Sequence, residues 1–396
     1  MRDDIIKQIL KDIDLPYEVK QKAKDRYEDL GKWLNREDSS IVKYHPYVFP
    51  QGSFLLQTTI RPITEDGEYD LDIGCKFQDG ISDKTITQKR LKEKLKEELE
   101  KYRTARNIKE PLEEKRRCWR LRYQDKMNFH IDIVPGIPVL EGDCSNYGFF
   151  YVDTYLKGEL ILNEHNLSLW KSLSLLITDA ESNDYEQISE NWHHSNPEGF
   201  AKWFRAKAAF EVMKGFQLES VRNEVVVDLP ISKQDTVLQR VIKLLKRHRD
   251  AMFLEDDKYA PISVIISKLA ADVYQGESSL EIALMSIISG MQKLLENRIT
   301  NIPNPTELLE NYADKWIENS YYQRNFQMWL IEAKKDFTVL CKDELTREIA
   351  EPIIRDSFKI HFADSYAKLV RENSEIKRFS IQPINIAAIK TKPWTK

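Results

Sequence analysis

Two short acidic segments constrain this sequence more than any other feature. Residues 70–72 read Asp-Leu-Asp and residues 130–132 read His-Ile-Asp. This alternation of polar and apolar residues predicts β-strands with one buried face. Asp70 and Asp72 would then share one face of their strand, and Asp132 would lie on the side opposite Ile131. If the two strands are neighbours in a sheet, three carboxylates converge.

Such a cluster predicts a metal site. Like charges a few ångströms apart repel and raise one another's pKa, which is costly unless divalent cations neutralise them. Mg²⁺ prefers a few carboxylate oxygens together with waters and substrate phosphates. We therefore expect a phosphoryl-transfer site that holds two Mg²⁺ ions, for which Mn²⁺ can substitute.

A glycine-serine turn upstream strengthens this interpretation. Taken alone, Asp-Leu-Asp is weak evidence, because any half-exposed strand alternates acidic and aliphatic residues. Residues 50–54, however, read Pro-Gln-Gly-Ser-Phe. Glycine lets the backbone approach a phosphate closely, and a serine hydroxyl can donate to a phosphate oxygen.

Length and composition indicate an ordinary globular protein with two lobes. A chain of 396 residues exceeds the size at which a single core keeps growing. A net charge of −4 argues against a generally basic surface that coats nucleic acid. No apolar run reaches the length of a membrane span, and the start lacks a secretory segment, so we expect a cytoplasmic protein without a membrane partner. The widely spaced cysteines are expected to be buried thiols, at Cys75, Cys118, Cys144 and Cys341.

Periodicity predicts an α+β arrangement in the first half of the chain. Helical spacing covers residues 3–36 with a break at Pro16, and a charged helix is expected over 87–102. Strands are expected over residues 47–59, 69–77, 116–123 and 127–134, the last one closed by Pro135 and Gly136.

The second half is expected to be mostly helical. A helical pattern begins near Asn191, with Pro197 opening a helix that Ser195 or Asn196 could cap. Further helices are expected over residues 237–249 and 261–274 and onward to about residue 350. We predict an α+β lobe over residues 1–215, including the N-terminal helices, and a helical lobe over residues 216–396 that closes over the site.

The motifs resemble a known superfamily. A glycine-serine turn, a paired acid and a third acid on a later strand are similar to the nucleotidyltransferases related to DNA polymerase beta. Residues 192–200, 238–250 and 260–266 resemble segments of bacterial CD-NTases, the cyclic-oligonucleotide synthases of CBASS anti-phage systems. The resemblance covers most of the first 275 residues and implies a polymerase-beta-like fold with two lobes and a mixed sheet.

The resemblance implies roles for individual residues. Asp70, Asp72 and Asp132 would be the catalytic, metal-binding triad, with Asp132 nearest the attacking hydroxyl. The nucleotide-binding residues would be Gln51, Gly52, Ser53, Lys246 and Ser263. Alternatives are open for the last two: Lys243 lies one turn before Lys246, both lysines could form a solvated helix face, and Ser263 could be an ordinary serine of a first helical turn.

Some features depart from the family pattern. Sixteen residues separate Ser53 from Asp70, so the intervening hairpin is expected to be extended. No aromatic residue follows Ser263 directly. The chain also lacks a clustered Cys/His zinc insert, so direct sensing of duplex DNA is not expected. His130 is interpreted as a hydrogen-bonded neighbour of the site, and His193 and His194 as packing at the start of a helix.

The implied activity is the synthesis of a cyclic di- or trinucleotide second messenger from ATP and other NTPs. Its expected role is to activate a separate effector during phage infection, and a regulatory protein partner is possible. A transferase that makes linear oligonucleotides, or that modifies RNA or protein with the same core, is the alternative. A second alternative is a catalytically inactive scaffold that binds nucleotides. The sequence leaves the bases, the ring size and the linkage open.

Overall fold

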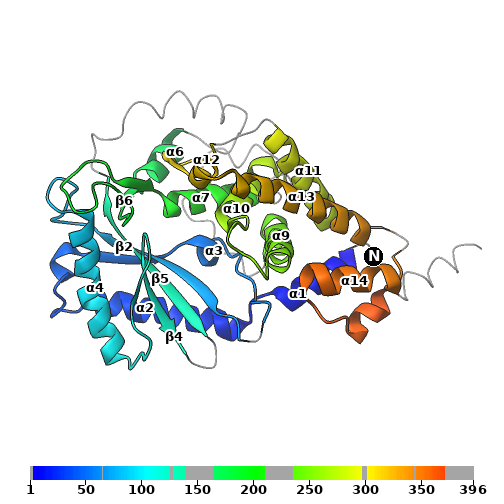
Figure 1. The fold of residues 1–396 in the computed structure, drawn as a ribbon, viewed down its shortest axis with the longest axis horizontal. Helices are drawn as coiled ribbons and strands as arrows, with labels where there is room; N and C mark the ends of the chain where they lie inside the picture. The colour runs from blue at the N-terminus through cyan, green and yellow to red at the C-terminus, as the bar shows by residue number, and fades with distance from the viewer. Residues whose placement is uncertain are drawn as a thin grey trace, which may run out of the picture.

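The computed structural model describes residues 3–64, 66–124, 128–139, 164–209, 235–296, 301–342 and 345–370. They form a lobe built on a mixed β-sheet and a lobe built on helices, which lie side by side (Figure 1). The predicted α+β class with two lobes is confirmed. The predicted boundary between residues 215 and 216 lies outside the described residues and stays a prediction.

The sheet has the order β1-β2-β5-β4-β3, and β6 continues from β5 to β7. Only the β2 and β5 pair is parallel; the other pairs are antiparallel. The strand bounds are β1 Pro46–Pro50, β2 Tyr69–Phe77, β3 Glu113–Glu114, β4 Trp119–Tyr123, β5 Phe129–Pro138, β6 Leu175–Ile177 and β7 His193–Ser195.

Two helices, α2 (Tyr17–Leu34) and α4 (Gln88–Ala105), cover one face of this sheet. The charged α4, predicted over residues 87–102, has an apolar stripe that is fully buried, at Leu91, Leu95 and Leu99. The side chain of Thr87 accepts a hydrogen bond from the Arg90 amide and caps the helix. The opposite face of β2 and β5 carries the acidic residues, and Asp70 and Asp72 line a cavity that residues of α9 and α10 also line.

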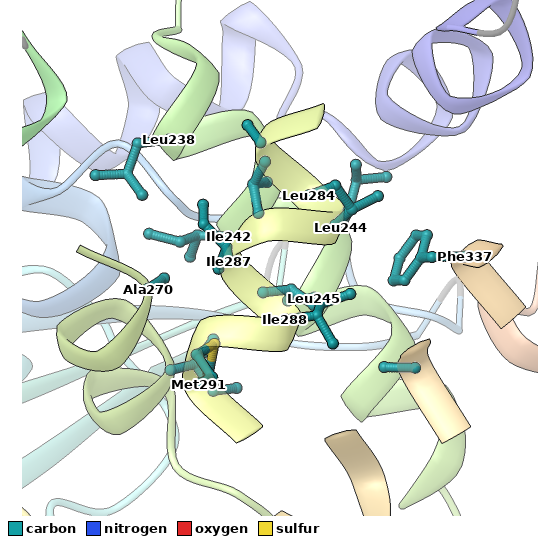
Figure 2. Close-up of a cluster of buried hydrophobic side chains, with 14 of the residues drawn as sticks. Leu238, Ile242, Leu244, Leu245, Ala270, Leu284, Ile287, Ile288, Met291 and Phe337 are labelled. Carbon is teal, nitrogen blue, oxygen red and sulfur yellow. The ribbon is translucent and has the colours of Figure 1, made fainter. Parts of the chain in front are cut away.

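Most of the other helices of this lobe pack around α9, the green helix behind the yellow α11 in Figure 2. Leucine and isoleucine side chains of α9 meet α10, α11 and α13 in a fully buried cluster. Thr236 and Gln239 form a capping box that fixes where α9 begins. The helices of this lobe are α9 Val237–Met252, α10 Ser263–Val273, α11 Leu280–Glu296, α12 Asp314–Glu318, α13 Ser320–Leu340 and α14 Arg347–Phe358.

Helices from the first half of the chain also join this helical core. The N-terminal helix α1 (Asp3–Ile13) packs its isoleucines against α9 and lies beside α14 (Figure 1). Helix α7 (Pro197–Ala208) buries Phe200, Trp203 and Phe204 in the same core. Asn196 caps α7 through Gly199, as one of the two predicted caps.

Several local predictions were wrong. The strand expected over residues 47–59 ends at Pro50, and the short helix α3 (Gly52–Leu55) follows. Strand β5 continues through Pro135 and Gly136, because Gly136 pairs with β2 on one side and β6 on the other. A hairpin of β8 (Pro303–Asn304) and β9 (Glu307–Asn311) interrupts the region expected to be helical.

The cysteine and membrane expectations can be checked on the described residues. Cys75 and Cys118 are buried free thiols, Cys341 is partly exposed, and Cys144 lies outside the described residues. Of the helices in the described ranges, none has the length and apolar character needed to cross a membrane.

Candidate active site

The register of two parallel strands brings the three predicted aspartates together. Asp72 on β2 lies directly opposite Asp132 on β5, and Asp70 lies opposite His130. Leu71 and Ile131, between them, are buried in the sheet core. Asp70 remains the most open of the acids, with its side chain 55% exposed, whereas that of Asp132 is 14% exposed.

The charges of the cluster act on Asp72. Burial of this carboxyl, together with the charges of Asp70 and Asp132, raises its pKa well above the ordinary value, although Lys246 and Arg120 oppose the shift. Ionisation of Asp72 therefore lowers the stability of the folded protein. A divalent cation between these carboxylates would remove that cost.

The glycine-serine turn lies directly against Asp72. The Gln51 amide donates to the Asp72 carbonyl at 2.8 Å, and Gly52 opens α3 with a φ of 59°. A Cβ on Gly52 would lie 2.2 Å from the Asp72 Oδ2 atom, so only glycine lets the turn approach this closely. Ser53 Oγ lies 3.1 Å from Thr59 Oγ1. All three predicted residues of the turn line the cavity between the lobes.

Of the two candidate lysines, Lys246 reaches the cavity. Its Nζ donates to the Thr58 carbonyl at 3.0 Å, just beyond the glycine-serine turn. Burial lowers its pKa to about 8, with the carboxylates of Asp70 and Asp72 acting in the opposite direction. Lys243 instead bonds to Asp14 and Asp235. The alternative of a solvated face is wrong, because both lysines are buried.

Ser263 lies in the same wall of the cavity, with an arginine beside it that sequence reasoning missed. Ser263 is the first residue of α10 and caps nothing with its side chain. Arg249, one turn after Lys246 on α9, donates from Nη2 to Ser263 Oγ at 3.1 Å and also bonds to Asp250 and the Pro261 carbonyl. Because Ser263 Oγ accepts this bond, its own hydroxyl hydrogen is free to donate into the cavity.

His130 is bonded to Asp70, as the sequence interpretation expected. Its Nε2 lies 2.9 Å from Asp70 Oδ1, and its Nδ1 lies 3.0 Å from Glu68 Oε2. Burial lowers the pKa of His130, but the bond to Asp70 outweighs it, and the net direction is upward. Arg122 holds Glu68 with its Nη1 atom at 2.7 and 2.6 Å. His130 and Glu68 thus form a chain that fixes the orientation of Asp70.

Arg120 is a second residue that sequence reasoning missed. It lies opposite Asp132 in the antiparallel register of β4 and β5. Its Nε and Nη2 atoms donate to the two oxygens of Asp132 at 2.6 and 2.7 Å. Every carboxylate of the triad therefore has a cationic side chain nearby.

The residues present fit a divalent cation. One ligand atom each of Asp70, His130 and Asp132 lies within 4.8 Å of the others, and Asp72 is beside them. Carboxylate oxygens are the ligands that Mg²⁺ prefers, and the raised pKa of Asp72 records the surplus of negative charge there.

The cavity, of about 580 Å³, extends from this cluster to a polar far end. There Arg117 lies 3.4 Å from Asp314 of α12, joining the sheet lobe to the helical lobe. His193 also lines this end; it belongs to strand β7, so the interpretation as packing at a helix start was wrong. Burial lowers the pKa of His193 to about 4, which keeps it neutral at neutral pH.

Comparisons with known proteins agree with this geometry. Residues 46–135 match the family model described as cyclic GMP-AMP synthase DncV-like, nucleotidyltransferase domain. A c-di-GMP synthase of Roseivirga ehrenbergii is 29% identical over 304 residues, which are 76% of this chain and 69% of that protein. The chain is therefore similar to CD-NTases, in its nucleotidyltransferase domain and over most of its length.

Two solved CD-NTases share the fold of this chain. CdnG of Bradyrhizobium diazoefficiens, a cyclic dinucleotide synthase, is 22% identical over 347 residues, or 83% of this chain and 73% of that protein. Its structure with GTP has a TM-score of 0.64 and covers 95% of this chain and 99% of that one, at 19% identity. Vibrio cholerae DncV with the linear intermediate pppA(3′,5′)pG has a TM-score of 0.54, at 14% identity and coverages of 92% and 95%.

Proposed function

We propose that this protein joins two nucleoside triphosphates, at least one of them GTP, into a cyclic dinucleotide and releases two pyrophosphates. The observation that carries the proposal is the facing arrangement of opposite charges in one cavity. Asp70 and Asp72 line the cavity from the sheet, with Asp132 directly beside Asp72, and Lys246 and Arg249 line it from α9. A triphosphate between these walls would meet metal ions on one side and fixed cations on the other.

The residues of the acidic wall would hold two Mg²⁺ ions. Bound there, the ions would lower the pKa of a ribose hydroxyl and neutralise charge on the leaving pyrophosphate. Asp132 would lie nearest the attacking hydroxyl. The oxygen of this ribose hydroxyl forms a bond to the α-phosphorus of the donor, and the bond from that phosphorus to the β-phosphate oxygen breaks. The hydroxyl proton passes to solvent.

The opposite wall would hold the departing group. Lys246 donates one N–H to Thr58, which leaves further donors for the donor phosphates, and Ser263 has a free hydroxyl hydrogen. Arg249 adds a fixed guanidinium beside Ser263. After the first bond forms, the linear product would turn so that its remaining hydroxyl meets its own triphosphate, and the same residues would act a second time.

The Arg117 and Asp314 pair in the cavity supports guanine as one base. Arg117 donates from Nε to Asp179 and from Nη2 to Asp314, which leaves guanidinium N–H groups for the O6 and N7 acceptors of guanine, and Asp314 can accept from its N–H donors. The names of the relatives agree with this choice, because one is a c-di-GMP synthase and CdnG was solved with GTP. Adenine presents an amino donor where guanine has O6, so it would meet Arg117 unfavourably.

The biological role is proposed from the family resemblance. The cyclic product would be a second messenger in CBASS anti-phage defence, acting through a separate effector, and a regulatory protein could control its synthesis. We propose that the protein works in the cytoplasm, where NTPs and Mg²⁺ are available. Synthesis of a linear oligonucleotide by the same core is the alternative.

The test is a product assay with purified protein and radiolabelled ATP, GTP, CTP and UTP, with Mg²⁺ or Mn²⁺, followed by phosphatase. We expect a phosphatase-resistant product that contains guanine and that mass spectrometry shows to lack both termini. EDTA should abolish it, and added Mg²⁺ should restore it, since the carboxylates alone have no means to neutralise the leaving pyrophosphate. Linear products would contradict cyclisation and favour the alternative.

A change at Asp314 tests the choice of base. We expect D314A to lower kcat/KM for GTP by about 10- to 100-fold while changing that for other NTPs little, because a lost hydrogen-bonding partner is selective for the base that used it. Glu318→Gln, on the same helix α12, is the matched control for loss of one negative charge. Equal losses with every NTP would show that Asp314 supports the lobe contact through Arg117 and does not recognise a base.

A further inference from the structure

Arg120 occupies the oxygens through which Asp132 would bind a metal ion. Both guanidinium bonds are short, and the side chains of Arg120 and Asp132 are only 20% and 14% exposed. This two-point geometry is the strongest form of pairing between arginine and a carboxylate. The arginine charge is permanent in proteins, so the pair does not dissolve by deprotonation.

The position of Arg120 follows from strand pairing. Arg120 and Asp132 are direct partners across β4 and β5, so their Cβ atoms lie on the same face at the closest spacing in the sheet. Arg122, two residues further on the same face of β4, reaches past the cluster to Glu68. One strand thus carries two arginines, of which only Arg120 contacts the triad.

A metal ion and this arginine need the same atoms. A cation at Asp132 must take a lone pair of an oxygen that accepts from Arg120, and it would stand close to a fixed positive charge. The shared oxygen atoms and the repulsion between the two cations act in the same direction. Both make Asp132 a poorer metal ligand while its pair with Arg120 is intact.

We propose that Arg120 competes with the metal for Asp132, so that full loading of the site requires the guanidinium to turn away from this carboxylate. The inference rests on the proposed metal-dependent function. It assigns Arg120 the role of a positioning residue that sets the metal concentration at which the site fills. The same pairing would hold Asp132 in place when metal is scarce and limit repulsion within the triad.

The experiment measures Mn²⁺ binding to the full-length protein without nucleotide, by electron paramagnetic resonance of free Mn²⁺. We expect R120Q to bind Mn²⁺ about tenfold more tightly than the unaltered protein, a change of one decade in Kd. R120K, which keeps the charge but cannot form the two-point pair, should lie between the two. R90Q removes an equal charge from α4, on the opposite face of the sheet, where Arg90 pairs with Glu93 and Glu97, and it should stay within about twofold of the unaltered protein.

Two results would overturn the proposal. Unchanged or weaker Mn²⁺ binding by R120Q would show that Arg120 supports Asp132 as a ligand, and equal tightening by R90Q would show that only net charge matters. D132N identifies the binding event, because it should remove the affected Mn²⁺ site. Thermal unfolding in EDTA checks the fold of each variant, and R120K decides the question if R120Q does not fold.

Binding and synthesis are read separately in this design. If the protein binds Mn²⁺ as expected but yields no cyclic product, the proposed function fails while the competition stands. If the product forms and R120Q leaves the Mn²⁺ affinity unchanged, the competition fails while the proposed function stands.

Discussion

Asp72→Asn is expected to abolish synthesis of the nucleotide product while leaving the fold intact or more stable. Asparagine keeps the size of the side chain but offers no negative charge to a metal. We expect activity to fall by at least about 10³-fold, more than the roughly 10- to 100-fold that follows loss of residues which only orient metal ligands. The product assay with GTP and ATP measures this change directly.

The stability part of this prediction follows from the raised pKa of Asp72. Burial and the charges of Asp70 and Asp132 raise that pKa in the folded protein, so the folded state binds a proton more tightly than the unfolded state does. Stability from this group is present at low pH and is lost as pH rises from the ordinary carboxyl value through the raised one. In EDTA at neutral pH, D72N should therefore unfold at an equal or higher temperature than the unaltered protein, and its unfolding temperature should fall less with rising pH.

A lower unfolding temperature for D72N would contradict this reasoning and assign Asp72 a structural role. Asp79→Asn is the matched control, because Asp79 is an exposed acid beyond the last residue of β2, where it pairs with His45. It should leave both synthesis and unfolding nearly unchanged, as surface substitutions away from such features usually do.

The two strands that carry the aspartates were predictable because their apolar residues alternate and are buried. Leu71 and Ile131 lie in the sheet core, as the period of two required. Their register was not predictable. That Asp72 faces Asp132 depends on how the chain between the two strands crosses the sheet, and no local pattern records which strands become neighbours.

Arg120 was missed for the same reason. Residues 119–123 read Trp-Arg-Leu-Arg-Tyr, so alternation already placed both arginines on one face. Only the pairing of β4 with β5 turns that face toward Asp132. Basic residues that alternate along one strand can pair with acidic residues of a neighbouring strand. This signal could have predicted the contact of Arg120 only if the neighbouring strand was known.

The glycine-serine turn shows where a local rule failed. The apolar pattern of residues 47–59 favours a strand throughout, yet the chain leaves the sheet after Pro50. A glycine in the left-handed region changes the chain direction and begins α3, which lies between β2 and α10 (Figure 1). The motif led to a segment that lies against Asp72 and lines the cavity, whereas periodicity gave its conformation wrongly.

Gly52→Ala is expected to cause a loss of synthesis comparable to loss of a metal ligand. The backbone at Gly52 has a φ of 59°, which costs an alanine roughly 1–2 kcal/mol. The added Cβ would also lie 2.2 Å from Asp72 Oδ2 and 3.1 Å from Asp72 Cγ, so either the turn or the carboxylate must move. We expect activity to fall by at least about 100-fold, because misplacement by about 1 Å costs that much in a positioned site.

Gly80→Ala separates these two effects. Gly80 has a φ of 70°, but a Cβ there would meet nothing closer than a Tyr44 ring carbon at 3.6 Å. G80A should therefore lose stability through the backbone alone and keep full synthesis, whereas G52A should lose both. If G52A lowered the unfolding temperature no more than G80A and still made product at the normal rate, the close approach of the turn to Asp72 would not matter for catalysis. The glycine would then serve only to turn the chain out of the sheet, and the cradle for the donor phosphates would have to be assigned to the opposite wall, where Lys246, Arg249 and Ser263 lie.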